Sequence, residues 1–208
     1  MPKPITLVVA DSGPLISLAI AERTDLLNLF GVPIHVLDIV REECLRKPDS
    51  PGEPELKHWF AGNKDKIDII KSPIIGAYHE AVEREIAGIE PHATEGLGDA
   101  AISWFIVQAP RRYGSETISL ILTEDGPFGD TRLDRSVHVL STRPFLQTLE
   151  NMNLIPSAQT IISDIEAKSG RRVARYAADR PALIGRTGRT RSNWTDTVKR
   201  KAGSGIAD

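Results

Sequence analysis

Five short segments rich in apolar residues recur along the first 140 residues, and turn-forming or charged residues bound them. The first, residues 5–10, is apolar almost without interruption, which is typical of a strand buried on both faces of a parallel sheet. It stops at Asp11, and Gly13 and Pro14 then mark a turn. The pattern predicts strands at residues 5–10, 34–37, 67–70, 118–122 and 137–140.

Segments with helical spacing lie between these strands. Pro14 fits the first turn of a helix, because its missing N–H has no partner there in any case. Residues 100–107 are apolar nearly all round, which predicts a buried helix rather than a surface helix. Further helices are expected near residues 15–20, 26–30, 39–46, 55–61, 73–87 and 144–149. Strands that alternate with helices predict an α/β fold with a central parallel sheet and helices on both faces.

The pattern changes after residue 150. We expect residues 1–150 to form one α/β domain and residues 151–208 to form a C-terminal extension. Residues 158–168 predict a helix in this extension, with Ile161, Ile162 and Ile165 on one side. From about Pro181 the chain is rich in Gly, Arg, Thr and Ser. This last part is expected to be mobile, because it cannot bury enough apolar surface to offset the entropy of ordering.

Composition places the chain among globular proteins, since 40% of its 208 residues are hydrophobic and 26% are charged. No stretch approaches the roughly 20 apolar residues of a membrane-spanning helix. The N-terminus lacks the apolar region of a signal peptide. The single cysteine, Cys44, excludes an internal disulfide framework and a cysteine-based zinc site. These features predict a cytoplasmic protein with no membrane association.

Acidic residues follow the predicted strands or open the helices after them. Because parallel strands point the same way, these acids are expected to meet at one edge of the sheet, where α/β proteins keep their chemistry. Carboxylates packed together repel one another at neutral pH, and a divalent cation relieves the repulsion. Oxygen ligands favour Mg²⁺ or Mn²⁺ over zinc. The acids in question are Asp11, Glu42, Glu43, Asp99, Asp125 and Asp130.

Four short motifs contain most of these acids. The first, residues 8–18, is an apolar strand that ends in Asp-Ser before a short apolar helix. The second, residues 40–43, is a helix whose glutamate lies three residues after a valine, and the third, residues 96–102, is a glycine-rich turn that ends in an acid at a helix start. The fourth, residues 122–125, is a second strand that ends in acids. These motifs resemble those of PIN domains and occur in the same order.

The resemblance implies a three-layer α/β/α fold and a metal-dependent endoribonuclease that hydrolyses RNA phosphodiester bonds. Metal ions in such a site activate a water molecule and stabilise the attacked phosphate. Four acids match the family's catalytic positions: Asp11, Glu43, Asp99 and Asp125. The acids expected to contact Mg²⁺ or Mn²⁺ are Asp11, Asp99, Asp125 and Asp130.

Other residues near these acids have supporting roles in the prediction. Ser12 adjoins Asp11, so its hydroxyl is placed to orient a ligand or the attacking water. Glu42 is an alternative to Glu43 as the second acid, and Glu43 is preferred because it shares a helix face with Val40. Two more acids, expected to be exposed neighbours that strengthen the negative field, are Glu95 and Glu124.

Many bacterial PIN proteins are toxins of the VapC-like group, so the resemblance also implies a small antitoxin protein as partner and a homodimer. Two other functions stay open at this point. One is a catalytically inactive PIN fold that binds RNA or protein. The other is a different α/β protein, such as a receiver-type phosphoacceptor that uses Asp11.

The C-terminal extension is basic, with 11 Lys and Arg against 5 Asp and Glu, although the whole chain has a net charge of −2. Three interpretations are open. The extension is a solvated tail without a role, a plug over the acids, or an RNA clamp that restores attraction to phosphates through counterion release. The arginines expected to contact RNA are Arg171, Arg172, Arg175, Arg189 and Arg191.

Overall fold

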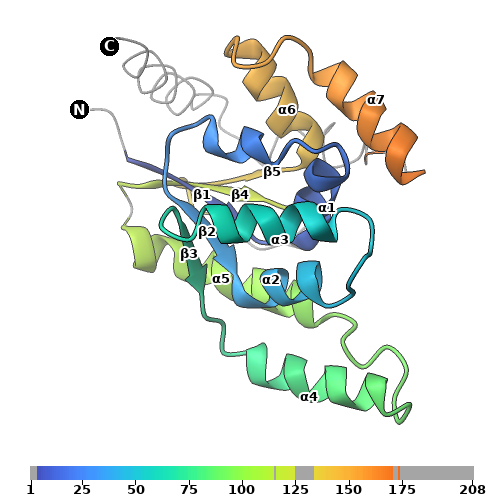
Figure 1. Ribbon diagram of the computed structural model, residues 1–208. Helices are drawn as coiled ribbons and strands as arrows, with labels where there is room; N and C mark the ends of the chain where they lie inside the picture. The colour runs from blue at the N-terminus through green and yellow to red at the C-terminus, as the bar shows by residue number, and fades with distance from the viewer. Residues whose placement is uncertain (1–3, 115, 125–133, 171–172, 174–208) are drawn as a thin grey trace.

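A parallel sheet forms the centre of the protein (Figure 1). The computed structural model describes residues 4–114, 116–124, 134–170 and 173. Within these ranges the strands are β1 (Ile5–Val9), β2 (Ile34–Leu37), β3 (Ile67–Ile70), β4 (Ile118–Leu122) and β5 (Val137–Leu140). Their order in the sheet is β3-β2-β1-β4-β5, and every neighbouring pair is parallel. The predicted α/β fold with a central parallel sheet is therefore confirmed.

Helices cover both faces of this sheet. In Figure 1, α6 and α7 lie above the sheet and α5 lies below it, which gives the three layers of an α/β/α fold. The α-helices are α1 (Ser12–Ile20), α2 (Asp38–Leu45), α3 (Glu53–Gly62), α4 (Ile75–Ile86), α5 (Leu97–Tyr113), α6 (Thr142–Asn151) and α7 (Ala158–Ser169). None of the described helices is both long enough and apolar enough to cross a bilayer.

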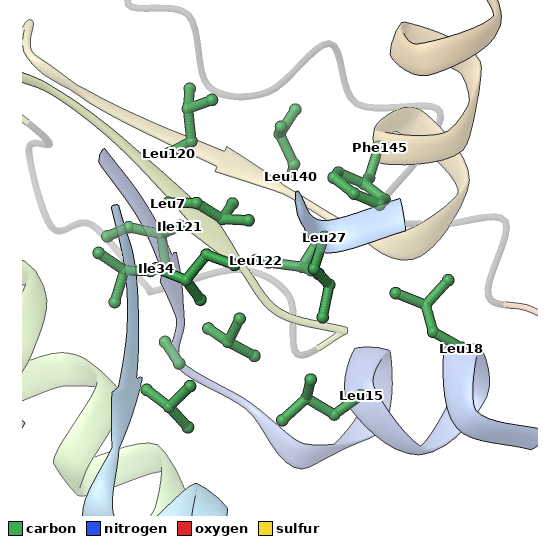
Figure 2. Close-up of a cluster of buried hydrophobic side chains, with 14 of the residues drawn as sticks. Leu7, Leu15, Leu18, Leu27, Ile34, Leu120, Ile121, Leu122, Leu140 and Phe145 are labelled. Carbon is green, nitrogen blue, oxygen red and sulfur yellow. The ribbon is translucent and has the colours of Figure 1, made fainter. Parts of the chain in front are cut away.

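The central strands β1 and β4 are buried at every position, as their continuous apolar sequences predict. Figure 2 shows Leu7 of β1, Leu120 of β4, Leu18 of α1 and Phe145 of α6 as members of one cluster of buried side chains. Phe145 also meets Phe30 edge to face, with 5.5 Å between ring centroids. Each such side chain contributes about 1.5–3 kcal/mol by leaving water. This packing fixes the relative position of the strand ends that carry the acids.

Two predicted helices differ in the structure. α5 is not buried all round, because Val107 is 56% exposed while Ile102 and Phe105 on its other side are buried. Only one face of α5 contacts the sheet, and an apolar sequence does not reveal which of its residues face solvent. Residues 26–30 were predicted to lie in an amphipathic helix, and the structure has a short 3₁₀ helix, η1 (Thr24–Asn28), instead.

The helix predicted in the C-terminal extension is present as α7. Its apolar side, with Ile161, Ile162 and Ile165, is buried against the rest of the core, and the helix packs on α1 and α6. An exposed ion pair of 3.1 Å joins Lys168 of α7 to Glu22 after α1. The segment from Pro181 onward, predicted to be mobile, lies outside the described residues.

Candidate functional site

The carboxyl ends of β1 and β4 mark the point where the strand order reverses. From β1 the chain builds outward through β2 and β3, and it then crosses to the other side of β1 to form β4 and β5. In open α/β sheets, ligands bind in the crevice outside the strand ends at such a point. Asp11 follows β1 here, and Thr123 and Glu124 follow β4.

Asp11 connects the two strand ends through its carboxylate. Its Oδ1 accepts a hydrogen bond from the backbone N–H of Gly13 at 3.1 Å and thereby caps α1. Its Oδ2 accepts the backbone N–H of Glu124 at 2.7 Å and the hydroxyl of Thr123 at 3.4 Å. Asp11 therefore has a structural role in addition to any chemical one.

Four carboxylates line one pocket of about 310 Å³ at this edge of the sheet. Asp11 comes from the end of β1, Glu43 from α2, Glu95 from the loop before α5, and Asp99 from the first turn of α5. Among the described residues that line this acid pocket, none is basic. The structure thus brings three of the predicted catalytic acids to one pocket.

Glu43, not Glu42, faces the acid pocket. Burial raises the pKa of Glu43 above its ordinary value, and a hydrogen bond from Ser12 opposes that rise. The negative charges of Asp11 and Asp99 raise the pKa of Glu43 further, so these groups interact electrostatically. Glu42 has a side chain that is 45% exposed and pairs with Arg41 at 3.7 Å. The preference for Glu43 over Glu42 as the acid at the site is thus consistent with the geometry.

The loop that carries Asp99 is tethered to two helices. The backbone N–H and the hydroxyl of Thr94 donate to Glu85 of α4, at 2.9 and 2.7 Å. The other carboxylate oxygen of Glu85 pairs with Arg46, after α2, at 3.1 Å. Gly96 caps α5 with φ +78°, a left-handed conformation that favours glycine. These contacts hold the first turn of α5 beside Glu43.

Glu124 was expected to be an exposed acid, and this expectation is wrong. Its Oε1 accepts the backbone N–H of Thr142, the first residue of α6, at 3.1 Å, and its Oε2 is buried without a hydrogen-bond partner among the described residues. Burial raises the pKa of Glu124. A Cβ on Gly13 would lie only 3.0 Å from Glu124 Cγ, so the glycine makes room for this side chain. The one sequence signal for Glu124 is its position directly after β4.

Comparison with known proteins adds no relative to this geometry. No family model, curated protein or solved structure matches this chain. Any function must therefore be inferred from the residues of the site and from the four sequence motifs.

Several residues of the predicted site lie outside the described residues, namely Asp125, Asp130, Arg171, Arg172, Arg175, Arg189 and Arg191. In the part of the chain that the structure describes, no group of three or more His, Cys, Asp or Glu side chains is arranged to hold a metal ion. Asp11, Glu43 and Asp99 thus share a pocket without forming a closed ligand shell by themselves.

Proposed function

We propose that this protein is a metal-dependent endoribonuclease of the PIN type, which hydrolyses RNA phosphodiester bonds. The observation that carries the proposal is that Asp11, Glu43 and Asp99 line one pocket at the reversal point of a parallel sheet. These acids come from separate parts of the chain, and no described basic residue lines the pocket to offset their repulsion. A bound cation compensates for such repulsion.

The donor atoms of the acid pocket suit a hard divalent cation. They are carboxylate and hydroxyl oxygens, which favour Mg²⁺ or Mn²⁺ over zinc. Asp11, Glu43 and Asp99 line this pocket but are not arranged to hold an ion by themselves, so Asp125 or Asp130, outside the described residues, would have to supply further ligands. A bound ion would activate a water molecule and stabilise negative charge on the phosphate.

The protein's own side chains have distinct tasks in this proposal. Burial raises the pKa of Glu43, and a hydrogen bond from Ser12 orients its carboxylate in the pocket. Asp11 is already held by the N–H groups of Gly13 and Glu124, so it need not reorganise when a ligand arrives.

A second candidate is a PIN-fold module that binds RNA or protein without cleaving it. The observation that favours it is the absence, among the described residues, of three acids arranged to hold one ion. The two proposals differ in metal binding, because a scaffold does not need a cation in the acid pocket. Titration calorimetry with Mn²⁺ therefore distinguishes them.

The four PIN-like motifs also support a more specific proposal, in which the protein is a cytoplasmic toxin. A small antitoxin protein would then be its partner, and the toxin would act as a homodimer. Co-expression with the product of a short neighbouring gene, followed by purification of the complex, tests the antitoxin. Sedimentation analysis of the purified protein tests the dimer.

RNA cleavage by matched glutamine variants tests the nuclease proposal directly. Glu43→Gln is expected to lower cleavage in Mg²⁺ or Mn²⁺ by roughly 10–100-fold, since it removes a carboxylate of the acid pocket. Glu42→Gln changes the neighbouring residue on the same helix and is expected to leave cleavage unchanged, because Glu42 pairs with Arg41 instead. Equal cleavage by wild type and Glu43→Gln would refute the proposed role of the acid pocket.

A further inference from the structure

A second cavity, of about 670 Å³, adjoins the acid pocket and shares Ser12, Glu43 and Thr94 with it. One wall is the face of α1 that carries Ser12, Ile16 and Ile20 at intervals of four residues. Four residues of an α-helix span about 6 Å, slightly more than one turn. Because Ser12 belongs to both cavities, this apolar wall leads towards the carboxylates. We name this cavity the α1 groove.

A second wall of the α1 groove comes from the end of the described chain. Ile165 and Ser169 of α7 line it, together with Val173. Val173 is buried, and its backbone N–H donates to Oε1 of Glu166 at 3.1 Å. The chain continues beyond this point as residues 174–208. This remaining segment therefore starts at the α1 groove itself.

The acid pocket and residues 174–208 are complementary in charge. The pocket is lined by four carboxylates and, within the described part of the chain, by no basic residue. The segment contains eight Lys and Arg against three Asp and Glu. Two basic residues, Arg46 and Lys47, lie on the wall of the α1 groove, and Arg46 is already paired with Glu85. Neither of them lines the acid pocket at the end of the groove. The charge distribution therefore favours a cationic side chain of the segment at the acid end of the groove.

The sequence of this segment matches the spacing of residues along α1. Leu183 and Ile184 are its only adjacent pair of large aliphatic residues, and Arg186 follows two positions later. In an extended chain, alternate side chains point to the same side and two residues span about 6.6 Å. This is close to the spacing of about 6 Å between Ile16 and Ser12 along α1. With Ile184 on Ile16, Arg186 reaches Ser12 at the entrance of the acid pocket.

We propose that residues 182–186 of the chain's own C-terminal segment dock in the α1 groove, with Ile184 on Ile16 and Arg186 among the carboxylates. Ten residues lie between Val173 and Ile184, and their extended length of about 33 Å exceeds the length of α1, about 14 Å. A guanidinium at this position takes the place of a divalent ion and keeps RNA from the site. This inhibition rests on the proposed function, whereas the docking does not.

Paramagnetic relaxation enhancement in the full-length chain tests the docking. Cys44 is the single cysteine, so a Cys44→Ala, Ala182→Cys variant carries one nitroxide label. The label is expected to broaden the amide signals of Ile16 and Ile20 and to leave those of β3 sharp. Adding Ile184→Asp is expected to abolish the broadening. Adding Val198→Asp, a matched change outside the docked residues, is expected to preserve it.

Four outcomes overturn the proposal. The first is sharp α1 signals in the labelled protein, and the second is broadening that survives Ile184→Asp. The third is broadening of the α1 signals in chains without a nitroxide when they are mixed with nitroxide-labelled chains, because a second copy then occupies the groove. The fourth is a segment that contacts added RNA but never the groove, which identifies an RNA clamp instead.

RNA cleavage provides a separate measurement of the inhibition. Arg186→Glu is expected to raise cleavage several-fold, because the carboxylates then repel the segment. If the broadening depends on Ile184 but the protein does not cleave RNA, the docking is supported and the proposed nuclease is refuted. Cleavage that is unchanged by Arg186→Glu, in a protein that does cleave RNA, overturns the inhibition.

Discussion

Replacing Asp11 with asparagine is expected to destabilise the fold as well as to abolish the proposed RNA cleavage. The carboxylate accepts the N–H of Gly13 through Oδ1 and the N–H of Glu124 through Oδ2. Asparagine has one acceptor oxygen, so one of these two N–H groups then faces an amide NH₂. Loss of the helix cap costs about 1 kcal/mol. Loss of the 2.7 Å bond to Glu124 costs about 1.5–3 kcal/mol, because its acceptor is ionised.

The side chain will adopt the less costly orientation, which keeps the bond to Glu124. We therefore expect Asp11→Asn to lower the free energy of unfolding by about 1–2 kcal/mol. For a chain of this size, that corresponds to a melting temperature about 2–8 °C lower. Urea unfolding followed by circular dichroism in metal-free buffer measures the difference without any contribution from a bound cation.

Asp99→Asn is the matched control for this experiment. Asp99 is exposed in the first turn of α5, and no hydrogen bond ties its carboxylate to the described residues. Its removal costs only a weak interaction with the helix N-terminus, about 0.3–0.5 kcal/mol at an exposed position. Both variants are expected to lose the proposed cleavage, but Asp11→Asn is expected to lose more stability than Asp99→Asn. Equal unfolding midpoints for Asp11→Asn and wild type would refute the structural role of Asp11.

Two further substitutions test the surroundings of the acids. Glu43→Gln is expected to stabilise the metal-free fold at pH 7, because burial raises the pKa of Glu43 and the folded state disfavours its charged form. This gain in stability should vanish as the pH falls below about 4.5, the ordinary pKa of a glutamate, because the carboxyl of Glu43 is then protonated in the folded and unfolded states alike. A urea midpoint for Glu43→Gln below that of wild type at pH 7 would contradict this expectation. Gly13→Ala is expected to destabilise by about 1–2 kcal/mol, since its Cβ would lie 3.0 Å from Glu124 Cγ. Gly76→Ala in α4, where a Cβ meets no atom within 4 Å, should instead stabilise the fold by about 0.5–1 kcal/mol. Equal changes in melting temperature for the two alanine variants would show that Gly13 is not tightly packed.

The strands could be predicted closely from the sequence. β2, β3, β4 and β5 have the residue bounds that their apolar segments predict, and β1 ends one residue earlier than expected. Burial on both faces requires apolar residues throughout a central strand, so its pattern and its bounds coincide. The parallel arrangement of the strands could also be predicted from the sequence, because a helix lies between most successive strands. This arrangement is what brings Asp11 and Glu124 to one edge.

The surroundings of individual side chains could not be predicted in the same way. Glu124 is partly buried, and its carboxylate accepts the N–H of Thr142, which lies 18 residues later in the chain. Val107 is exposed because neighbouring elements leave one face of α5 uncovered. Both results depend on where distant segments pack, which local apolar periodicity does not encode. Of the acids predicted to meet at the edge, the structure brings Asp11, Glu43 and Asp99 together, and the sequence did not predict that Asp11 and Glu124 would be tied together there.

The hydrogen bonds of Asp11 have a consequence for how this protein can diverge during evolution. Any descendant that folds still needs the cap of α1 and the link to the end of β4. Selection for folding alone will therefore retain Asp11, whereas it leaves Asp99, which is exposed, free to change to other residues. An aspartate at position 11 of a related sequence will then reflect the fold, and only the residue at position 99 will reflect selection for the proposed RNA cleavage.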